Sequence, residues 1–223
     1  MTLTRRAGLG LILAGALSGG GPAFAAGAKL SERDGDIWIS DGAGERRLTR
    51  NGANRDPALS PDGRLVAYVH DDQKTADDFG YPKSSLWLCD LTTGATRRAA
   101  APQASDQVGQ DFTGIGSPVF SLGGGFVYVM ANAWVTSAAI HQVNLKTGAH
   151  RYVIDGNSVA VIRTGPYRGF LLVNRHRYRA NGGGAYDPTF VVRPDAKVAF
   201  AIPGSEDRDA AVGAWLKRHG GTV

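Results

Sequence analysis

The chain has 223 residues and a formal net charge of +5, from 25 basic and 20 acidic side chains. This excess is too small to favour nucleic acid as a partner. Hydrophobic residues make up 43% of the chain, enough for a packed core, while the 31 glycines disfavour a helical fold. The single cysteine, Cys89, excludes an internal disulfide and lies in an apolar run, where we expect it to be buried.

The first 25 residues have the features of a cleavable signal peptide. Arg5 and Arg6 form a basic start, residues 7–17 are apolar but too short to span a bilayer, and Ala23-Phe24-Ala25 fits a small-x-small cleavage site. Thr4-Arg5-Arg6 resembles a twin-arginine export signal, with Sec export as the alternative. We therefore expect a periplasmic or secreted bacterial protein that does not span the membrane after processing.

A strong hairpin signal lies in residues 58–69, which read ALSPDGRLVAYV. A tight turn between the two apolar runs requires a positive φ, which glycine accepts. We assign the turn to four consecutive residues, Ser60, Pro61, Asp62 and Gly63. These residues are expected to shape the turn and to have no catalytic role.

The same hairpin recurs downstream. Residues 119–130, VFSLGGGFVYVM, align with it without a gap, and a proline precedes each copy, Pro57 and Pro118. Residues 191–202, VVRPDAKVAFAI, form a looser third copy in which Ala196 replaces the turn glycine, so this turn is expected to differ in type. The hairpin is therefore one element of a repeat.

A second hairpin unit alternates with the first, over residues 37–48, 86–98 and 140–152. In each copy an apolar strand ends at Asp or Asn, a turn containing glycine follows, and a short strand carries basic residues. The copies differ at one aromatic position, where His141 replaces Trp38 and Trp87. The two hairpins together make a four-stranded antiparallel unit, which can bury both faces only by stacking on its neighbours.

The stretches DPALSPDGRLVAYV and SLWLCDLTTGATRRA resemble the Pro-Asp-Gly repeats of the TolB-like and WD-type β-propellers. The resemblance covers about residues 34–154. It implies an all-β fold, in which residues 26–204 form a β-propeller of four-stranded antiparallel blades. The expected number of blades is about four, which is the lower limit for propellers. Closing the ring would require C-terminal strands to complete the N-terminal half-blade. Otherwise the propeller is an open partial ring, or a second copy completes it.

Residues 205–223 are expected to form a short C-terminal helix and tail. Ser205 is the predicted N-cap, and basic residues near the end suit the helix dipole. Three apolar side chains of this helix should face inward: Val212, Trp215 and Leu216.

No sequence motif assigns catalytic chemistry. The Gly-x-Ser-x-Gly elbow of serine hydrolases is absent, and the five histidines show no spacing typical of zinc ligands. The pairs Asp71-Asp72 and Asp77-Asp78 lack the alternation of a calcium loop. The sequence therefore predicts no catalytic residue, no metal site and no cofactor.

The stretch NRHRYRANGGG, residues 174–184, is the candidate ligand-binding site. If residues 170–179 form one strand, their side chains alternate between two faces, with Arg175, Arg177 and Arg179 on one and His176 and Tyr178 on the other. Three like charges on one face repel unless they are solvated or matched by an anion or carboxylates. The expected ligand is an acidic glycan, a lipid headgroup or an acidic protein patch. The alternative is a solvent-facing edge strand protected by its charge.

The resemblance implies protein partners in the envelope, bound at the ends or central opening of the propeller. We expect a non-enzymatic binding module of the periplasm or cell envelope, and an uncompleted blade would favour self-association. The alternative is a small propeller-fold hydrolase or lyase acting on an envelope or plant-type glycan. Convergent His, Arg and carboxylate groups with perturbed pKa values would favour the enzyme. Function is expected where the repeat breaks down, in residues 70–85 and after Phe170.

Overall fold

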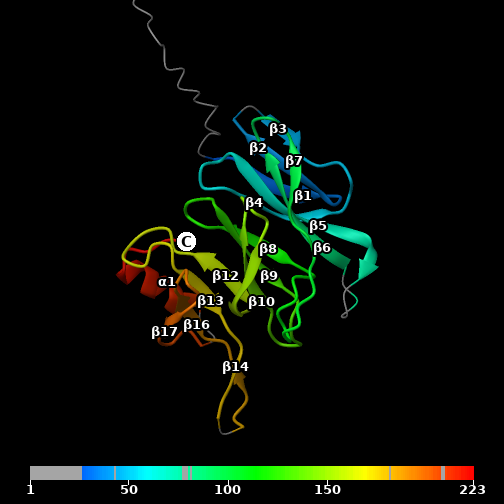
Figure 1. The fold of residues 1–223 in the computed structure, drawn as a ribbon. Helices are drawn as coiled ribbons and strands as arrows, with labels where there is room; N and C mark the ends of the chain where they lie inside the picture. Colours follow the sequence, from blue (N-terminus) through cyan, green and yellow to red (C-terminus); the bar gives the residue numbers. More distant parts are fainter. Residues whose placement is uncertain (1–26, 43, 77–79, 81, 181, 207–208) are drawn as a thin grey trace, which may run out of the picture.

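The computed structural model describes residues 27–42, 44–76, 80, 82–180, 182–206 and 209–223 (Figure 1). The predicted signal peptide, residues 1–25, lies outside the described residues, as do Asp77 and Asp78. The described chain is mostly β-strand with one short helix near its C-terminal end, which confirms the predicted fold class.

Four antiparallel sheets, here called the first to fourth blades, follow one another along the chain. The first blade contains β1 (Lys29–Arg33), β2 (Asp36–Asp41) and β3 (Gly44–Arg47). The second contains β4 (Asn54–Leu59), β5 (Leu65–Ala76), β6 (Pro82–Asp90) and β7 (Thr96–Ala100). The third contains β8 (Gly116–Phe120), β9 (Phe126–Ala131), β10 (Ala139–Asn144) and β11 (His150–Asp155).

The fourth blade contains β12 (Ser158–Val161), β13 (Leu171–Asn174), β16 (Thr189–Val192) and β17 (Val198–Ala201). A small separate hairpin, β14 (Arg177–Tyr178) and β15 (Ala185–Tyr186), is inserted between β13 and β16 and projects from the blade (Figure 1). The helix α1 (Asp209–Arg218) follows. Residues 70–85, where the repeat was expected to break down, are largely a continuation of β5 and the start of β6.

Turn chemistry explains the hairpins. Ser60, Pro61, Asp62 and Gly63 lie between β4 and β5, where Gly63 has a φ of 70° and the Ser60 Oγ accepts a hydrogen bond of 2.9 Å from the Leu65 N–H. The expected third copy is the β16–β17 hairpin, which is the second hairpin of its blade rather than the first. Ala196 in this turn has a φ of 72°. The turn therefore keeps the left-handed conformation, although alanine adopts it less readily than glycine does.

The prolines of the first hairpin mark a bulge in the first strand of two blades. Asp56 and Ser117, each directly before a proline, have φ values of 52° and 49°, and the strand register shifts there. The Asp56 N–H donates to Glu32 Oε2 at 3.2 Å, and the Ser117 N–H donates to Asp56 Oδ2 at 3.1 Å. Each bulge is therefore hydrogen-bonded to a carboxylate of the preceding blade.

Arginine residues on the last strands of the first three blades have a repeated structural role. An arginine of one blade donates from Nη2 to a backbone carbonyl in the last turn of the next. The three bonds are Arg46 to Leu91 at 3.3 Å, Arg97 to Leu145 at 2.9 Å, and Arg151 to Pro194 at 2.9 Å. These bonds fix the outer strands of successive blades to one another.

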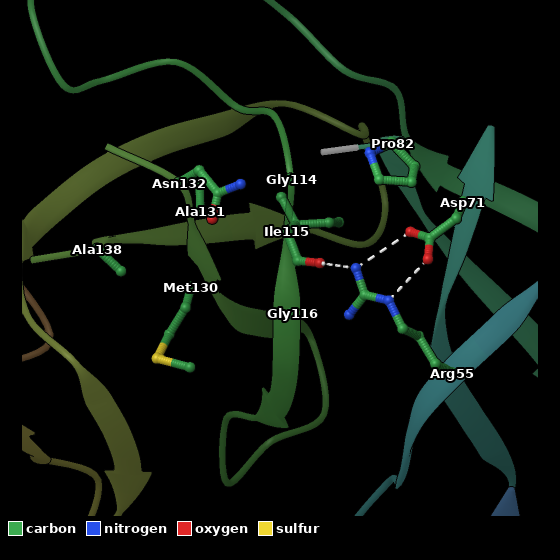
Figure 2. Close-up of a pocket in the computed structure, with 10 residues that line it drawn as sticks. All are labelled: Arg55, Asp71, Pro82, Gly114, Ile115, Gly116, Met130, Ala131, Asn132 and Ala138. Carbon is green, nitrogen blue, oxygen red and sulfur yellow. Dashed lines mark hydrogen bonds and ion pairs between the residues drawn. The ribbon is translucent and has the colours of Figure 1, made fainter. Parts of the chain in front are cut away.

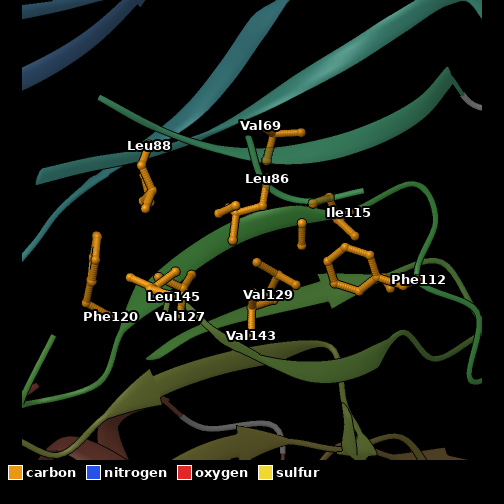
Figure 3. Packing of buried hydrophobic residues seen from close by; sticks show 14 residues of the cluster. Val69, Leu86, Leu88, Phe112, Ile115, Phe120, Val127, Val129, Val143 and Leu145 are labelled. Carbon is orange, nitrogen blue, oxygen red and sulfur yellow. The ribbon is translucent and has the colours of Figure 1, made fainter. Parts of the chain in front are cut away.

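The hydrophobic core lies between the blades. Figure 3 shows the packing between the second and third blades, where Leu86 and Leu88 face Val127 and Val129. Phe112, from the connector between these blades, completes this cluster. A separate cluster between the first and second blades contains Cys89, which is buried as expected, and burial raises the pKa of its thiol.

The two ends of this row of blades are covered differently. On the fourth blade, α1 packs against the face turned away from the third blade, with Trp215 only 5% exposed and Val212 and Leu216 partly buried beside it. These side chains face inward as predicted. The Oγ of Ser205, the predicted N-cap, donates to the Ile202 carbonyl at 2.7 Å and accepts from the Thr189 N–H at 2.9 Å. Residues 207 and 208, whose N–H groups a cap would bond, lie outside the described residues.

The outer face of the first blade is polar. Trp38 lies there between the guanidinium groups of Arg33 and Arg47, at 5.4 and 5.8 Å from the ring centroid, and Arg33 pairs with Glu45 at 2.8 Å. Within the described residues, no C-terminal strand pairs with this blade, and the first and fourth blades lie at opposite ends of the molecule in Figure 1. The described chain is therefore an open row of blades with a polar face at one end and a helix at the other.

Candidate functional site

The connections between strands divide the blades into two ends. In an antiparallel meander, successive connections alternate between the two edges of the sheet. One edge, the turn end, carries short connections such as residues 60–64 and 121–125. The other edge, the loop end, carries the connector 101–115, the β9–β10 loop 132–138 and the insertion 175–188, and the one long connection at the turn end among the described residues is the β12–β13 loop 162–170. Long loops on a rigid scaffold commonly carry binding residues, so the loop end is the candidate site.

Two adjoining cavities lie at the loop end. The first, of about 360 Å³, is lined mainly by apolar groups, among them Ile115, Met130 and Ala138 (Figure 2). The second, of about 500 Å³, is formed by the loop 132–138 and Asn157 and shares Asn132 and Ala138 with the first. Asn157 holds this loop in place, since its Nδ2 donates to the Thr136 carbonyl at 2.9 Å and its Oδ1 accepts from the Ala138 N–H at 3.0 Å.

Arg55 forms a charged wall of the first cavity. Figure 2 shows its Nε donating to Asp71 Oδ2 at 2.8 Å and its Nη2 to the Ile115 carbonyl at 2.8 Å. Its Nη1 donates to Asp56 Oδ2 at 2.7 Å. Burial alone would lower the pKa of Arg55, but the carboxylates of Asp71 and Asp56 raise it above its ordinary value. Arg55 thus joins the second and third blades and shapes the cavity rather than offering free donors to a ligand.

Exposed apolar side chains gather on the loop-end connections. Val135 is 98% exposed and Val108 is 87% exposed, and Tyr178 on β14 is also exposed. Trp134 lies against Gly109, where an added Cβ would come within 2.1 Å of the indole ring, so the two loops fit together only with glycine at this position. Apolar residues exposed on ordered loops are typical of a surface that another molecule covers.

The arginine-rich segment is not one strand as expected. β13 ends at Asn174, and the chain forms strands again only in the short β14–β15 hairpin. Between them, the Asn174 side chain donates to the Asp187 carbonyl, and the Arg175 N–H donates to the Pro188 carbonyl at 3.0 Å. The segment therefore lies at the base and along one side of the projecting hairpin.

The structure places the five candidate residues in two groups with internal partners. The guanidinium groups of Arg175 and Arg177 both donate to the Asp155 carboxylate, and the bond from Arg177 Nη1 to Asp155 Oδ2 is 3.0 Å long. Both guanidinium groups also lie over the Phe190 ring. The Asp155 carboxylate therefore offsets the repulsion between the positive charges of Arg175 and Arg177. In the second group, His176 Nδ1 contacts Asp187 Oδ1 at 2.8 Å, its ring contacts Tyr178, and Arg179 lies over the Tyr186 ring. Arg179 and Tyr178 are the most exposed of the five.

His141 occupies the aromatic position of the third blade and differs from its counterparts. When the blades are superposed on the arginine bonds that join them, His141 occupies the position held by Trp38, Trp87 and Phe190 in the other three blades. It is 1% exposed, and neither ring nitrogen has a hydrogen-bond partner. Burial and then the neighbouring His150 lower its pKa from 6.5 to about 4, although Asp111 opposes them. The exchange of tryptophan for histidine is visible in the repeat, but no local sequence pattern indicates its consequence.

We expect the exchange His141→Phe to increase stability by about 1–2 kcal/mol at neutral pH, because it removes two buried nitrogens without partners. The folded-state pKa of His141 lies below its ordinary value, so the wild-type protein loses stability as pH falls from 6.5 towards 4. The variant lacks this loss, which amounts to about 3 kcal/mol at the acid limit. Urea unfolding at a series of pH values measures the difference. Parallel pH profiles of the two proteins would show that His141 titrates normally.

Among the described residues, no group of three or more His, Cys, Asp or Glu side chains is arranged to hold a metal ion. The same part of the chain contains no helix with the length and hydropathy needed to cross a bilayer.

The fold is that of β-propeller proteins. The chain resembles TolB from Acinetobacter baumannii, with 19% identity over 80% of this chain and 42% of that one and a TM-score of 0.51. It also resembles the tricorn protease (15% identity, 80% of this chain and 16% of that one, TM-score 0.57). A third similar structure is Porphyromonas gingivalis dipeptidyl peptidase 4 (14% identity, 79% and 31%, TM-score 0.53).

The chain thus spans less than half the length of each of these structures. No family model matches the chain, and no curated protein matches it significantly. The comparisons therefore show a TolB-like propeller fold.

Proposed function

We propose that this protein is a non-enzymatic binding module of the periplasm or cell envelope, whose loop end binds a protein partner. The observation that carries the proposal is the asymmetry of the blades. Three of the long connections, the two adjoining cavities and the exposed side chains of Val108, Trp134 and Val135 all lie at one end. The opposite end consists mostly of tight turns.

The loop end suits a protein partner on physical grounds. The first cavity is lined largely by apolar groups, which favours insertion of an apolar side chain over binding of a charged metabolite. Exposed aromatic and aliphatic residues beside a cavity are the usual centre of a protein interface. The projecting hairpin adds Arg179 and Tyr178 at the same end, which suit a partner that carries acidic residues.

The location follows from the first 25 residues, whose basic start and small-residue cleavage site support export by the twin-arginine or Sec route. The mature protein recovered from the periplasm is expected to begin at Ala26.

Affinity capture from an envelope extract tests the proposal. The wild-type protein is expected to retain one protein in stoichiometric amount, and Val135→Asp should reduce this retention at least tenfold, because a carboxylate would be buried in the interface. Val198→Asp is the matched control, since Val198 is an exposed valine at the turn end, 42% exposed, and should bind as the wild type does.

Equal retention by both variants would contradict the assignment of the loop end. If the protein retains no partner and instead cleaves members of a glycan panel, the non-enzymatic proposal is wrong.

A further inference from the structure

A crevice between the second and third blades is lined in part by His141. Among the described residues, His141 is the one buried side chain whose polar atoms have no hydrogen-bond partner. The crevice has a volume of about 500 Å³ and is separate from the two loop-end cavities. Besides His141, its lining includes His150 and Tyr152 from β11 and the amide side chains of Gln103 and Gln110 from the connector.

The matching crevice between the first and second blades shows what the exchange of tryptophan for histidine changes. There Trp87 fills the space, its Nε1 donates to Ser85 Oγ at 2.9 Å, and the remaining cavity is about 250 Å³. With the smaller His141 at this position, and with the longer connector 101–115 beside it, the cavity is twice as large. The third blade therefore has both more space and an unsatisfied imidazole where the second has a satisfied indole.

The walls of the crevice are aromatic as well as polar. His150 stacks on Phe112 at a centroid distance of 4.2 Å, and its Nε2 contacts Gln103 Oε1 at 3.0 Å. The His141 ring lies 5.6 Å from that of His150 and 6.0 Å from that of Tyr152. Flat rings beside amide and imidazole groups are suited to a ligand with both C–H faces and hydroxyl groups.

The charges in the crevice give an anion no net attraction. Burial lowers the pKa of both His141 and His150, so both rings are neutral at pH 7. Arg151 is engaged by Gln142 Oε1 at 2.9 Å and by the Pro194 carbonyl at 2.9 Å. Asp106 adds a carboxylate to the lining. The lining thus combines neutral donors and acceptors with one basic and one acidic side chain, and a lining without net charge matches hydroxyl groups better than phosphate or carboxylate.

We propose that this crevice binds a neutral, hydroxyl-rich ligand, the end of a glycan chain, and that binding moves the crevice wall so that a sugar hydroxyl reaches the His141 ring nitrogens, which are closed to solvent in the free protein. The crevice shares no lining residue with the two loop-end cavities, although the connector 101–115 forms one of its walls and also belongs to the loop end. A buried imidazole that lacks a partner in the free protein gains one when the sugar binds, so His141 selects for ligands that carry a correctly placed hydroxyl group.

Histidine-ring NMR on the untagged protein tests the proposal, because the chain has five histidines, few enough to follow individually in one spectrum. Titration with cellobiose or N-acetylglucosamine at pH 7 should shift the His141 and His150 signals saturably, with a Kd of about 1 mM. The signals of His70, His176 and His219 should stay in place as internal references. Galacturonic acid and zinc chloride are the comparison probes.

His141→Phe should weaken saccharide binding at least tenfold while the protein stays folded, and Trp87→Phe, the same register position in the second blade, should leave binding unchanged. If neither saccharide shifts His141 and His150, the proposal is wrong. It is equally wrong if only galacturonic acid or zinc shifts them, since the crevice would then be an anion or metal site. Unchanged binding by His141→Phe would also overturn it.

Discussion

Replacing Trp215 with alanine is expected to lower the free energy of unfolding by about 3–5 kcal/mol. Trp215 is the most deeply buried residue of α1 and packs with Ile162, Leu172, Val191 and Ile202 on the face of the fourth blade that no other blade covers. Its loss leaves a cavity beneath the helix and loosens the contact that shields this apolar face. The variant should therefore also self-associate, because an uncovered blade face is suited to stacking on a second copy.

Urea unfolding and size-exclusion chromatography measure these two effects. Lys217→Ala, an exposed residue on the same helix, is the control and should change stability by no more than about 0.5 kcal/mol. If Trp215→Ala is as stable as this control and stays monomeric, α1 does not cover the end of the row of blades.

The exchange Asp36→Ala is expected to destabilise the protein by a similar amount, about 3–5 kcal/mol. Asp36 is fully buried, and its carboxylate accepts hydrogen bonds from the Arg47 guanidinium, from Thr49 Oγ1 at 2.8 Å and from the Asn51 N–H at 3.0 Å. It thereby fixes the connector between the first and second blades. Alanine at this position leaves the buried donors without an acceptor.

The same carboxylate predicts an acid transition. Burial alone would raise the pKa of Asp36, but the bonds from Arg47, Thr49 and two backbone N–H groups outweigh burial and lower it from 3.8 to about 2. A lowered folded-state pKa contributes stability above pH 3.8 that is lost as pH falls towards 2, about 2 kcal/mol in total.

Urea unfolding measures this loss of stability between pH 3.8 and pH 2 in the wild-type protein. The variant Asp36→Asn has no carboxylate at this position and should not show the part of the loss that Asp36 causes. Asp72→Ala, a carboxylate with only local bonds to Lys74 and Thr75, is the control and should cost about 0.5 kcal/mol. Similar losses in Asp36→Ala and Asp72→Ala would contradict the role given to Asp36.

The hairpins could be predicted from the sequence because their signals are local. A turn such as Ser60-Pro61-Asp62-Gly63 is specified within a few residues, and the alternation of two hairpin types shows how strands are grouped. The inward face of α1 followed from its helical spacing for the same reason. Whether the ring closes could not be predicted, since closure depends on contacts between opposite ends of the chain.

The contacts that join the blades could not be predicted because their partners are far apart in sequence. Arg97 reaches the Leu145 carbonyl and Arg55 reaches that of Ile115, and no local pattern pairs such residues. The acceptor of Arg175 and Arg177 was missed in the same way, since Asp155 belongs to a different blade. His141 is the exception, because the repeat itself showed that a tryptophan position had changed.

The central claim is that a row of propeller blades presents its loop end to a partner, and site-specific photo-crosslinking tests it most directly. A photoreactive phenylalanine at position 135, in place of the almost fully exposed Val135, is expected to give one defined crosslinked product with an envelope protein. The same residue at position 198, at the turn end, should give none. Crosslinking from position 198 but not from position 135 would contradict the account.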